Sequence, residues 1–159
     1  MTASILAATV LEGHLAGCVQ ESLSLFLFDN AKWLAERLVA QSPSEQNVSL
    51  LAVCYFQANQ AYRAYQLLRS SGITTHSARY LLALCCIQLG KLNDARDALL
   101  KQGDREVPLG AAGLYLLGRV YRLVGRLQDA KEQYVQALRL NPLMWSAYEE
   151  LCALGGFPH

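Results

Sequence analysis

Residues 111–142 read AAGLYLLGRVYRLVGRLQDAKEQYVQALRLNP, and this stretch decides the fold. Apolar and small residues recur in it at the intervals of two successive helices. Small residues at Gly118, Ala130 and Ala137 would let the two helices approach closely. Pro142 cannot continue a helix, so it ends the second one. The stretch therefore predicts a hairpin of two antiparallel helices.

The spacing inside this hairpin is that of a tetratricopeptide (TPR) repeat. With Ala111 as position 1, positions 7, 8, 11, 20, 24, 27 and 32 are occupied by Leu117, Gly118, Tyr121, Ala130, Tyr134, Ala137 and Pro142. Position 4 departs from the pattern, because it carries Leu114 where the family prefers tryptophan. A single hairpin cannot bury its apolar face alone, so we expect neighbouring repeats of the same kind.

The same spacing recurs along the chain. The inferred repeats begin 33, 31 and 35 residues apart, close to the ~34-residue TPR period, at Glu12, Glu45, His76 and Ala111. We predict an all-α, right-handed TPR solenoid that forms one domain over residues 1–159. Its repeats cover about residues 12–43, 45–72, 76–102 and 111–142, followed by a terminal helix over 143–154. The first repeat is degenerate, because its positions 7, 8 and 11 carry Cys18, Val19 and Ser22.

Turn and capping residues predict where several helices end. Gly90 and Gly125 both fall at position 15 of their repeats, inside nearly identical turns. Asp29 and Asn30 can cap the second helix of the first repeat, and Ser44 can cap the helix that follows.

Composition and charge limit the classes of partner. Hydrophobic residues make up 53% of the chain, which is far too apolar for disorder. Fourteen basic and thirteen acidic residues leave a net charge of +1, so we expect no nucleic-acid partner and no attraction to an anionic membrane. The five cysteines are odd in number and form no CxxC pair, which favours core thiols in a reducing compartment.

The N-terminus resembles a bacterial lipobox at residues 15–18 (LAGC), but its flank does not fit a signal peptide. No lysine or arginine precedes Lys32, and Glu12 and His14 interrupt the apolar region. By this reading no apolar run reaches the ~18 residues of a membrane span. We therefore expect a soluble, intracellular protein with no membrane partner.

Catalytic chemistry has no candidate in the sequence. The three histidines, His14, His76 and His159, have no acidic or cysteine partner at a spacing that suggests a metal site. Neighbouring Cys85 and Cys86 point to different faces of a helix, which favours core packing over a redox pair. No glycine-rich phosphate loop is present. We expect no catalytic residue, metal, cofactor or small-molecule substrate.

A protein partner is the better expectation. In a TPR stack, positions 2, 5, 9, 12 and 13 of each first helix line the concave surface. These positions carry Val53, Phe56, Tyr80, Leu84, Ile87, Tyr115, Arg119, Arg122 and Leu123. The groove is apolar with basic residues at one end, and it lacks the lysine, asparagine and arginine clamp of chaperone-docking TPR proteins. It should therefore receive an apolar or amphipathic helix.

The N-terminal segment is a candidate for that helix. It carries more apolar side chains than one neighbouring helix can cover, namely Ile5, Leu6, Val10, Leu11, Leu15, Val19, Leu23, Phe26 and Leu27. One arrangement is a two-fold homodimer in which the N-terminal helix of each copy enters the groove of the other. In the alternative, the segment folds back as a cap of its own solenoid.

Several segments resemble the N-terminal region of the cell division cycle protein 27 family, the TPR scaffold subunits of the anaphase-promoting complex. They are NAKWLAERL (30–38), LAVCYF (51–56), QAYRAYQLL (60–68), RYLLA (79–83) and NPLMWSAYEELC (141–152). The resemblance covers about residues 19–155. It implies a homodimerising scaffold module that works with other subunits of the complex in the nucleus and cytoplasm, without catalysis or a metal. A monomeric TPR adaptor that binds a peptide of another protein is the remaining alternative.

Overall fold

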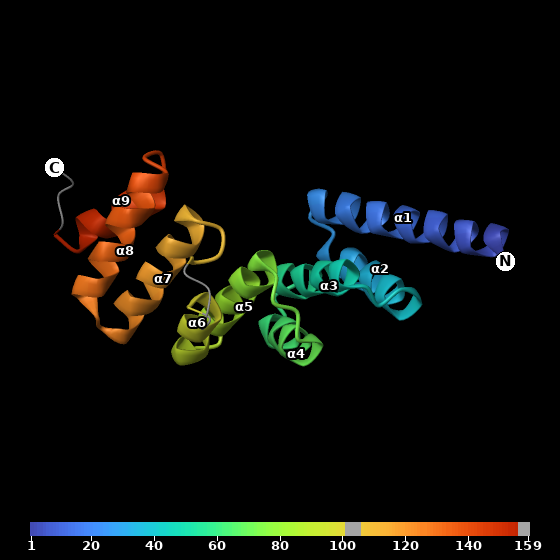
Figure 1. The fold of residues 1–159 in the computed structure, drawn as a ribbon, viewed down its shortest axis with the longest axis horizontal. Helices are drawn as coiled ribbons and strands as arrows, with labels where there is room; N and C mark the ends of the chain where they lie inside the picture. Colours follow the sequence, from blue (N-terminus) through green and yellow to red (C-terminus); the bar gives the residue numbers. More distant parts are fainter. Residues whose placement is uncertain (101–105, 156–159) are drawn as a thin grey trace. The chain divides into compact units, whose positions relative to one another are not determined.

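The computed structural model describes residues 1–100 and 106–155. Within these ranges the chain forms nine α-helices and no strand (Figure 1), which confirms the all-α prediction. The helices are α1 (Thr2–Ser24), α2 (Phe28–Gln41), α3 (Glu45–Gln57), α4 (Ala61–Ser71), α5 (His76–Gln88), α6 (Leu92–Leu99), α7 (Ala111–Val124), α8 (Leu127–Leu140) and α9 (Trp145–Ala153). They belong to two compact units, unit 1 (Met1–Ile73) and unit 2 (Thr74–His159).

Four helix pairs are closed by turns with one shared pattern of hydrogen bonds. In each turn a backbone N–H donates to the carbonyl three residues earlier, at 3.0 or 3.1 Å, and the next N–H donates to the carbonyl five residues earlier, at 2.8 Å. The first of these two donors has a positive φ, and it is Phe26, Asn59, Gly90 or Gly125. All four residues fall at position 15 of the repeats expected from the sequence.

Small residues let the paired helices pack closely. Position 20 is a fully buried alanine in all four pairs, at Ala31, Ala64, Ala95 and Ala130. In unit 2, Gly118 faces the ring of Tyr134, and a Cβ at this glycine would lie 2.5 Å from a ring carbon. The core of each pair therefore lies along the line where its two helices face each other.

The helix caps agree only in part with the sequence. The Ser44 hydroxyl accepts a hydrogen bond from the Asn47 N–H at 3.2 Å, as expected. The capping role predicted for Asp29 and Asn30 is wrong, because α2 already begins at Phe28 and has no side-chain cap. The N-cap position is Leu27, so Asp29 and Asn30 lie inside the first turn of α2. There Asp29 pairs with Lys32, and the Asn30 side-chain amide donates to the Ser22 hydroxyl.

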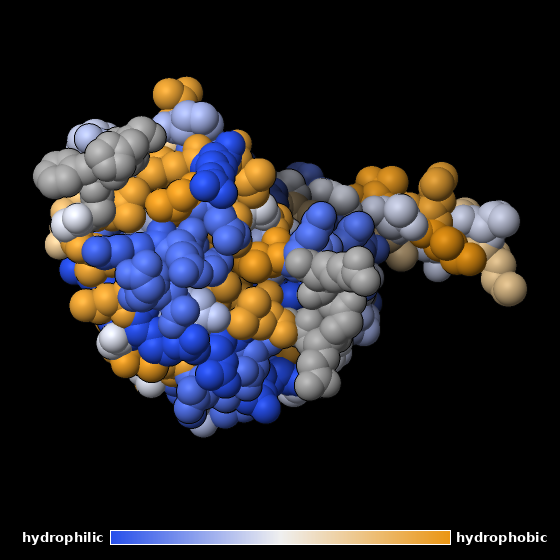
Figure 2. Space-filling view, turned by 60° about the vertical axis from the view of Figure 1, so that its left-hand side comes forward, coloured by the Kyte–Doolittle hydropathy of each residue, from blue (hydrophilic) through white to orange (hydrophobic). Residues whose placement is uncertain are grey.

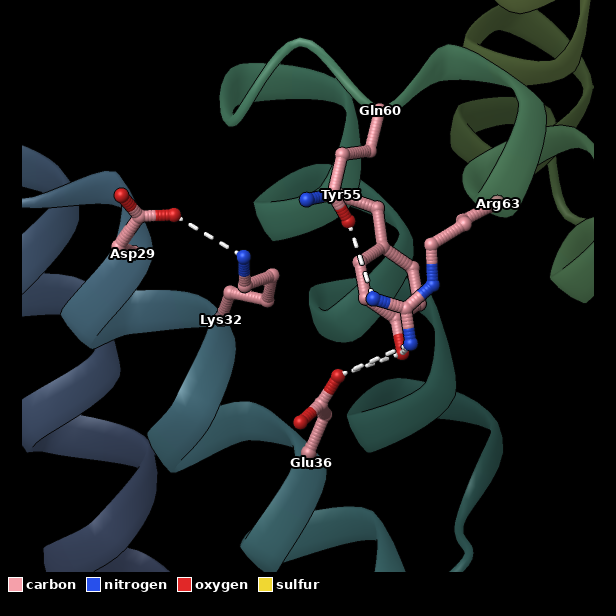
Figure 3. A network of polar contacts seen from close by, with 6 residues as sticks. All are labelled: Asp29, Lys32, Glu36, Tyr55, Gln60 and Arg63. Carbon is pink, nitrogen blue, oxygen red and sulfur yellow. Dashed lines mark hydrogen bonds and ion pairs between the residues drawn. The ribbon is translucent and has the colours of Figure 1, made fainter.

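A polar network joins α2, α3 and α4 of unit 1 (Figure 3). The Glu36 carboxylate accepts a hydrogen bond from the Tyr55 hydroxyl at 2.9 Å and pairs with the Arg63 guanidinium at 3.2 Å. The same guanidinium lies 4.2 Å from the centre of the Tyr55 ring and donates to Gln60 at 3.0 Å. These contacts hold α2, α3 and α4 in position relative to one another. The ion pair itself contributes little free energy, because both of its side chains are partly exposed to water.

In unit 2, two contacts anchor the short helix α6 and the terminal helix α9. The buried Arg79 on α5 donates to the carbonyl oxygens of Ala98 and Leu99 at the end of α6, both at 3.0 Å. On α9, Ala147 and Leu151 complete a buried cluster with three side chains of α8, Ala130, Tyr134 and Ala137.

Candidate protein-binding surfaces

The N-terminal part of α1 is an exposed apolar surface of unit 1. The only buried residues of α1 are Val19 and Ser22. Leu6 and Val10 are 69% and 66% exposed, and Ile5 and Leu11 are also exposed. In Figure 2, hydrophobic residues, coloured orange, lie exposed along the helix at the right of the view. We call Ile5, Leu6, Val10 and Leu11 the α1 apolar face.

The remaining residues of the predicted dimer helix do not belong to the α1 apolar face. Val19 is fully buried, so its assignment to a partner-binding helix is corrected: it occupies a TPR packing position inside unit 1. Leu15 and Leu23 are half-buried. Phe26 and Leu27 lie beyond the end of α1, in the turn that leads to α2.

The turn between α1 and α2 forms a second exposed surface, which sequence reasoning had merged with the helix. We call Leu25, Phe26 and Leu27 the α1–α2 corner. All three side chains are exposed, and Phe26 is 78% exposed with φ at 60°. The available signal was that Phe26 occupies position 15, where two of the other repeats carry glycine and the third carries asparagine.

The predicted groove residues lie on the helices expected for them. In unit 1, Val53 and Phe56 are half-buried on α3. In unit 2, Tyr80, Leu84 and Ile87 are half-buried on α5, and Tyr115 and Arg119 are half-buried on α7. Arg122 and Leu123 are exposed near the end of α7.

We define the α5–α7 surface of unit 2 by predicted groove residues on α5 and α7, namely Tyr80, Leu84, Ile87, Tyr115, Arg119 and Arg122. Its two arginines differ in their contacts. Arg122 forms an ion pair with Glu150 of α9. Arg119 has no hydrogen bond or ion pair among the described residues, although its charge reaches the Tyr80 phenol. Burial raises the pKa of Tyr80, nearby Tyr115 adds to the rise, and the positive charge of Arg119 opposes it. The surface thus offers aromatic rings beside one half-buried, uncommitted cation.

One buried polar group of unit 2, the Tyr134 hydroxyl, stays in its neutral form. The Tyr134 hydroxyl is buried without a hydrogen-bond partner among the described residues. Burial raises its pKa, the Glu150 carboxylate adds to the rise, and Arg122 opposes it. A phenol in such a place contributes packing and cannot readily act as a base.

The core cysteines are poor nucleophiles for the same reason. Burial raises the pKa of Cys54 to about 11. Burial and the adjacent Cys86 raise the pKa of Cys85 to about 12. In residues 1–100 and 106–155, no group of three or more His, Cys, Asp or Glu side chains could hold a metal ion.

The expectation that no segment reaches the length of a membrane span needs correction. By length and composition, α1 could cross a membrane: its mean hydropathy reaches 1.4, and only 6% of the apolar window is buried. The helix runs unbroken to Ser24, and Glu12 and Glu21 are too few to lower the mean. Core helices and N-terminal signal sequences pass the same test. The Glu12 carboxylate accepts a hydrogen bond from Asn47 of α3 at 2.9 Å, which holds this helix to its own unit.

Comparison with known proteins gives the class and then the family. Residues 111–143 match the tetratricopeptide repeat model, and residues 24–102 match the model described as anaphase-promoting complex, cyclosome, subunit 3. The solved structure "Crystal structure of APC/C hetero-tetramer Cut9-Hcn1" matches 95% of this chain, at a TM-score of 0.78 and 25% identity, and 31% of its own length. The structure "Cdc27 N-terminus" shares the fold over 91% of this chain and 68% of its own, at a TM-score of 0.77 and 19% identity. The chain is thus a TPR protein.

Sequence relatives identify the family. Cell division cycle protein 27 homolog B of Arabidopsis thaliana is 48% identical over 147 residues, which cover 91% of this chain and 20% of the relative. The Homo sapiens homolog is 37% identical over 161 residues, which cover 94% of this chain and 20% of the relative. The chain belongs to the anaphase-promoting complex subunit 3 family, that of cell division cycle protein 27. It spans about a fifth of the length of these relatives.

Proposed function

We propose that this chain is a non-catalytic scaffold module of an anaphase-promoting complex subunit, and that it joins two copies of that subunit. Its relationship to cell division cycle protein 27 supports the place in the complex. Its partners would be a second copy of itself and other subunits of the complex. We also propose that it acts in the nucleus and cytoplasm, which imaging of the tagged full-length protein would test.

The observation that carries the homodimer is the α1 apolar face. Leu6, Val10 and their two neighbours are exposed in the N-terminal part of α1, and the anchoring contacts of this helix to unit 1 begin at Glu12 and include the buried Val19 and Ser22. Burying one such side chain is worth about 1.5 to 3 kcal/mol, so four of them can support a stable interface. Exposed apolar surface of this kind marks a protein or membrane contact.

The groove residues offer the complementary surface. Half-buried Leu84 and Ile87 of α5 are apolar and lie on the first helix of their repeat. An apolar helix laid against such a surface is a recurring mode of recognition. In a two-fold dimer each copy would supply one α1 and one groove. The same contact would therefore form twice, and the exposed surfaces of both copies would be covered.

The test is to make the N-terminal part of α1 polar without changing its buried residues, Val19 and Ser22. The double variant Leu6→Asp/Val10→Asp should be folded by circular dichroism and monomeric by light scattering at about 10 µM, because each carboxylate would have to be desolvated in the interface. The matched control is Leu143→Asp, which changes an equally apolar and even more exposed residue outside both surfaces. If the double variant stayed dimeric, α1 would not be the interface.

The same measurement separates the proposal from a monomeric adaptor. An adaptor would give the monomer mass for the wild type, for the double variant and for the control alike. Its groove would then be open to a peptide of another protein.

A further inference from the structure

The α1–α2 corner contains a conformational conflict that the other three turns avoid. The four turns have the same hydrogen bonds, and each needs a positive φ at position 15. Glycine adopts this conformation freely and asparagine tolerates it, as at Gly90, Gly125 and Asn59. A bulky aromatic residue such as Phe26 is strained there. The first repeat therefore keeps a side chain that its own turn disfavours.

Packing within the chain does not explain Phe26. Its side chain is 78% exposed, and its flanking residues Leu25 and Leu27 are exposed as well. Phe28 makes an edge contact with it, at 6.1 Å between ring centres. Strain at an exposed aromatic residue is informative, because strained residues concentrate where another molecule is bound.

The charge beside the corner points to what covers it. Glu21, one turn before the end of α1, is exposed, and its carboxylate has no hydrogen bond or ion pair among the described residues. Residues 1–31 contain no lysine or arginine. The charged side chains of α1 are therefore the carboxylates Glu12 and Glu21, with His14 as its one other ionisable side chain apart from Cys18. The α5–α7 surface has the opposite character, with the rings of Tyr80 and Tyr115 beside the uncommitted Arg119.

We propose that in the homodimer the α1–α2 corner docks on the α5–α7 surface of the second copy. Phe26 packs against Tyr80 and Tyr115 there, and the Glu21 carboxylate pairs with Arg119. This inference rests on the proposed homodimer, and it deepens that proposal by naming the receiving residues. It also gives the strain at Phe26 a function, since the ring is retained for the partner at a cost to its own turn.

The first experiment separates stability from association at one residue. In the monomeric Leu6→Asp/Val10→Asp background, Phe26→Asn should raise the melting temperature, because asparagine tolerates the turn. In the otherwise wild-type chain it should weaken the homodimer by about tenfold or more in sedimentation velocity, because the anchor is lost. Phe26→Tyr should keep the wild-type dimer. The matched control is Asn59→Gly, which relaxes the same turn in the second repeat and should leave the dimer affinity unchanged.

The second experiment locates the receiving surface. Glu21→Arg and Arg119→Glu should each weaken the homodimer by about tenfold, and the double reversal should restore most of the affinity because it rebuilds the pair. Both residues are at least partly exposed, so the variants should fold, and circular dichroism checks that they do.

The outcomes separate this inference from the proposed function. A wild-type dimer whose affinity Phe26→Asn does not change would overturn the docking of the corner and leave the homodimer standing. A wild-type dimer that the single reversals weaken and the double reversal does not rescue would overturn Arg119 as the receiving residue. A monomeric wild-type chain would overturn the homodimer and the docked corner together.

Discussion

Single residues set how closely these helices can pack, and Gly118 is the clearest case. A Cβ at Gly118 would lie 2.5 Å from the Tyr134 ring, which is fully buried and cannot move aside. Gly118→Ala should therefore lower the free energy of unfolding by about 1 to 3 kcal/mol in urea titration.

The matched control for this variant is Gly17→Ala in the middle of α1. Nothing lies within 4 Å of the position that a Cβ would take at Gly17, so alanine should raise stability by up to about 1 kcal/mol through helix propensity. Equal effects of the two substitutions would contradict the close packing of α7 on α8.

Buried thiols predict the alkaline limit of the fold. The pKa of Cys54 is about 11 and that of Cys85 about 12 in the folded chain, against 9.0 without burial. Above pH 9 the unfolded chain loses thiol protons that the folded chain retains. Stability should therefore hold between pH 7 and about 8.5, and then fall by up to about 1.4 kcal/mol per pH unit for each thiol.

Chemical denaturation at a series of pH values would measure this loss. Cys54→Ala/Cys85→Ala should remove most of the pH dependence between about pH 8.5 and 9.5, below the range where the unfolded chain begins to lose its tyrosine protons, even though the variant starts less stable. An unchanged alkaline slope in that variant would assign the loss to other groups.

At the scale of single elements, α6 depends on a side chain from its neighbour. Arg79 closes the end of this short helix by donating to the carbonyl oxygens of Ala98 and Leu99. Arg79→Leu should leave those carbonyls without their donors and cost about 1 to 3 kcal/mol. Hydrogen exchange of the α6 amides should then quicken more than that of α8, whereas a uniform change across unit 2 would contradict a local capping role.

The helices themselves could be predicted well from sequence, because their signals are local. Alanine at position 20 and glycine or asparagine at position 15 reflect steric needs of a single hairpin, and they recur at the TPR spacing. Asp29 and Asn30 misled for a related reason: a side chain caps a helix only from the N-cap position, and the exact end of a helix is the part that sequence places least well. Here Leu27 occupies that position, and both residues lie within α2.

The surfaces were less predictable, because exposure depends on how elements pack. From apolar periodicity, Val19 and Leu6 were both assigned to the helix surface that contacts a partner. The structure buries Val19 inside unit 1 and exposes Leu6. The conflict at Phe26 became visible only when its backbone conformation could be compared with those of the three equivalent turns. The family, by contrast, was correctly indicated by short motifs such as residues 141–152.

At the scale of the whole molecule, the central issue is what covers the α1 apolar face. A helix that combines exposed Leu6 and Val10 with a length suited to a membrane can be covered by lipid or by protein. The anchored carboxylate of Glu12 and the family of the chain favour a protein, and the proposed dimer supplies one.

Sedimentation equilibrium of the wild-type chain tests this account most directly. At micromolar concentration and moderate salt the account predicts a mass of twice the 17.5 kDa chain, falling to the single-chain mass for Leu6→Asp/Val10→Asp. A wild-type mass of one chain across that concentration range would contradict it.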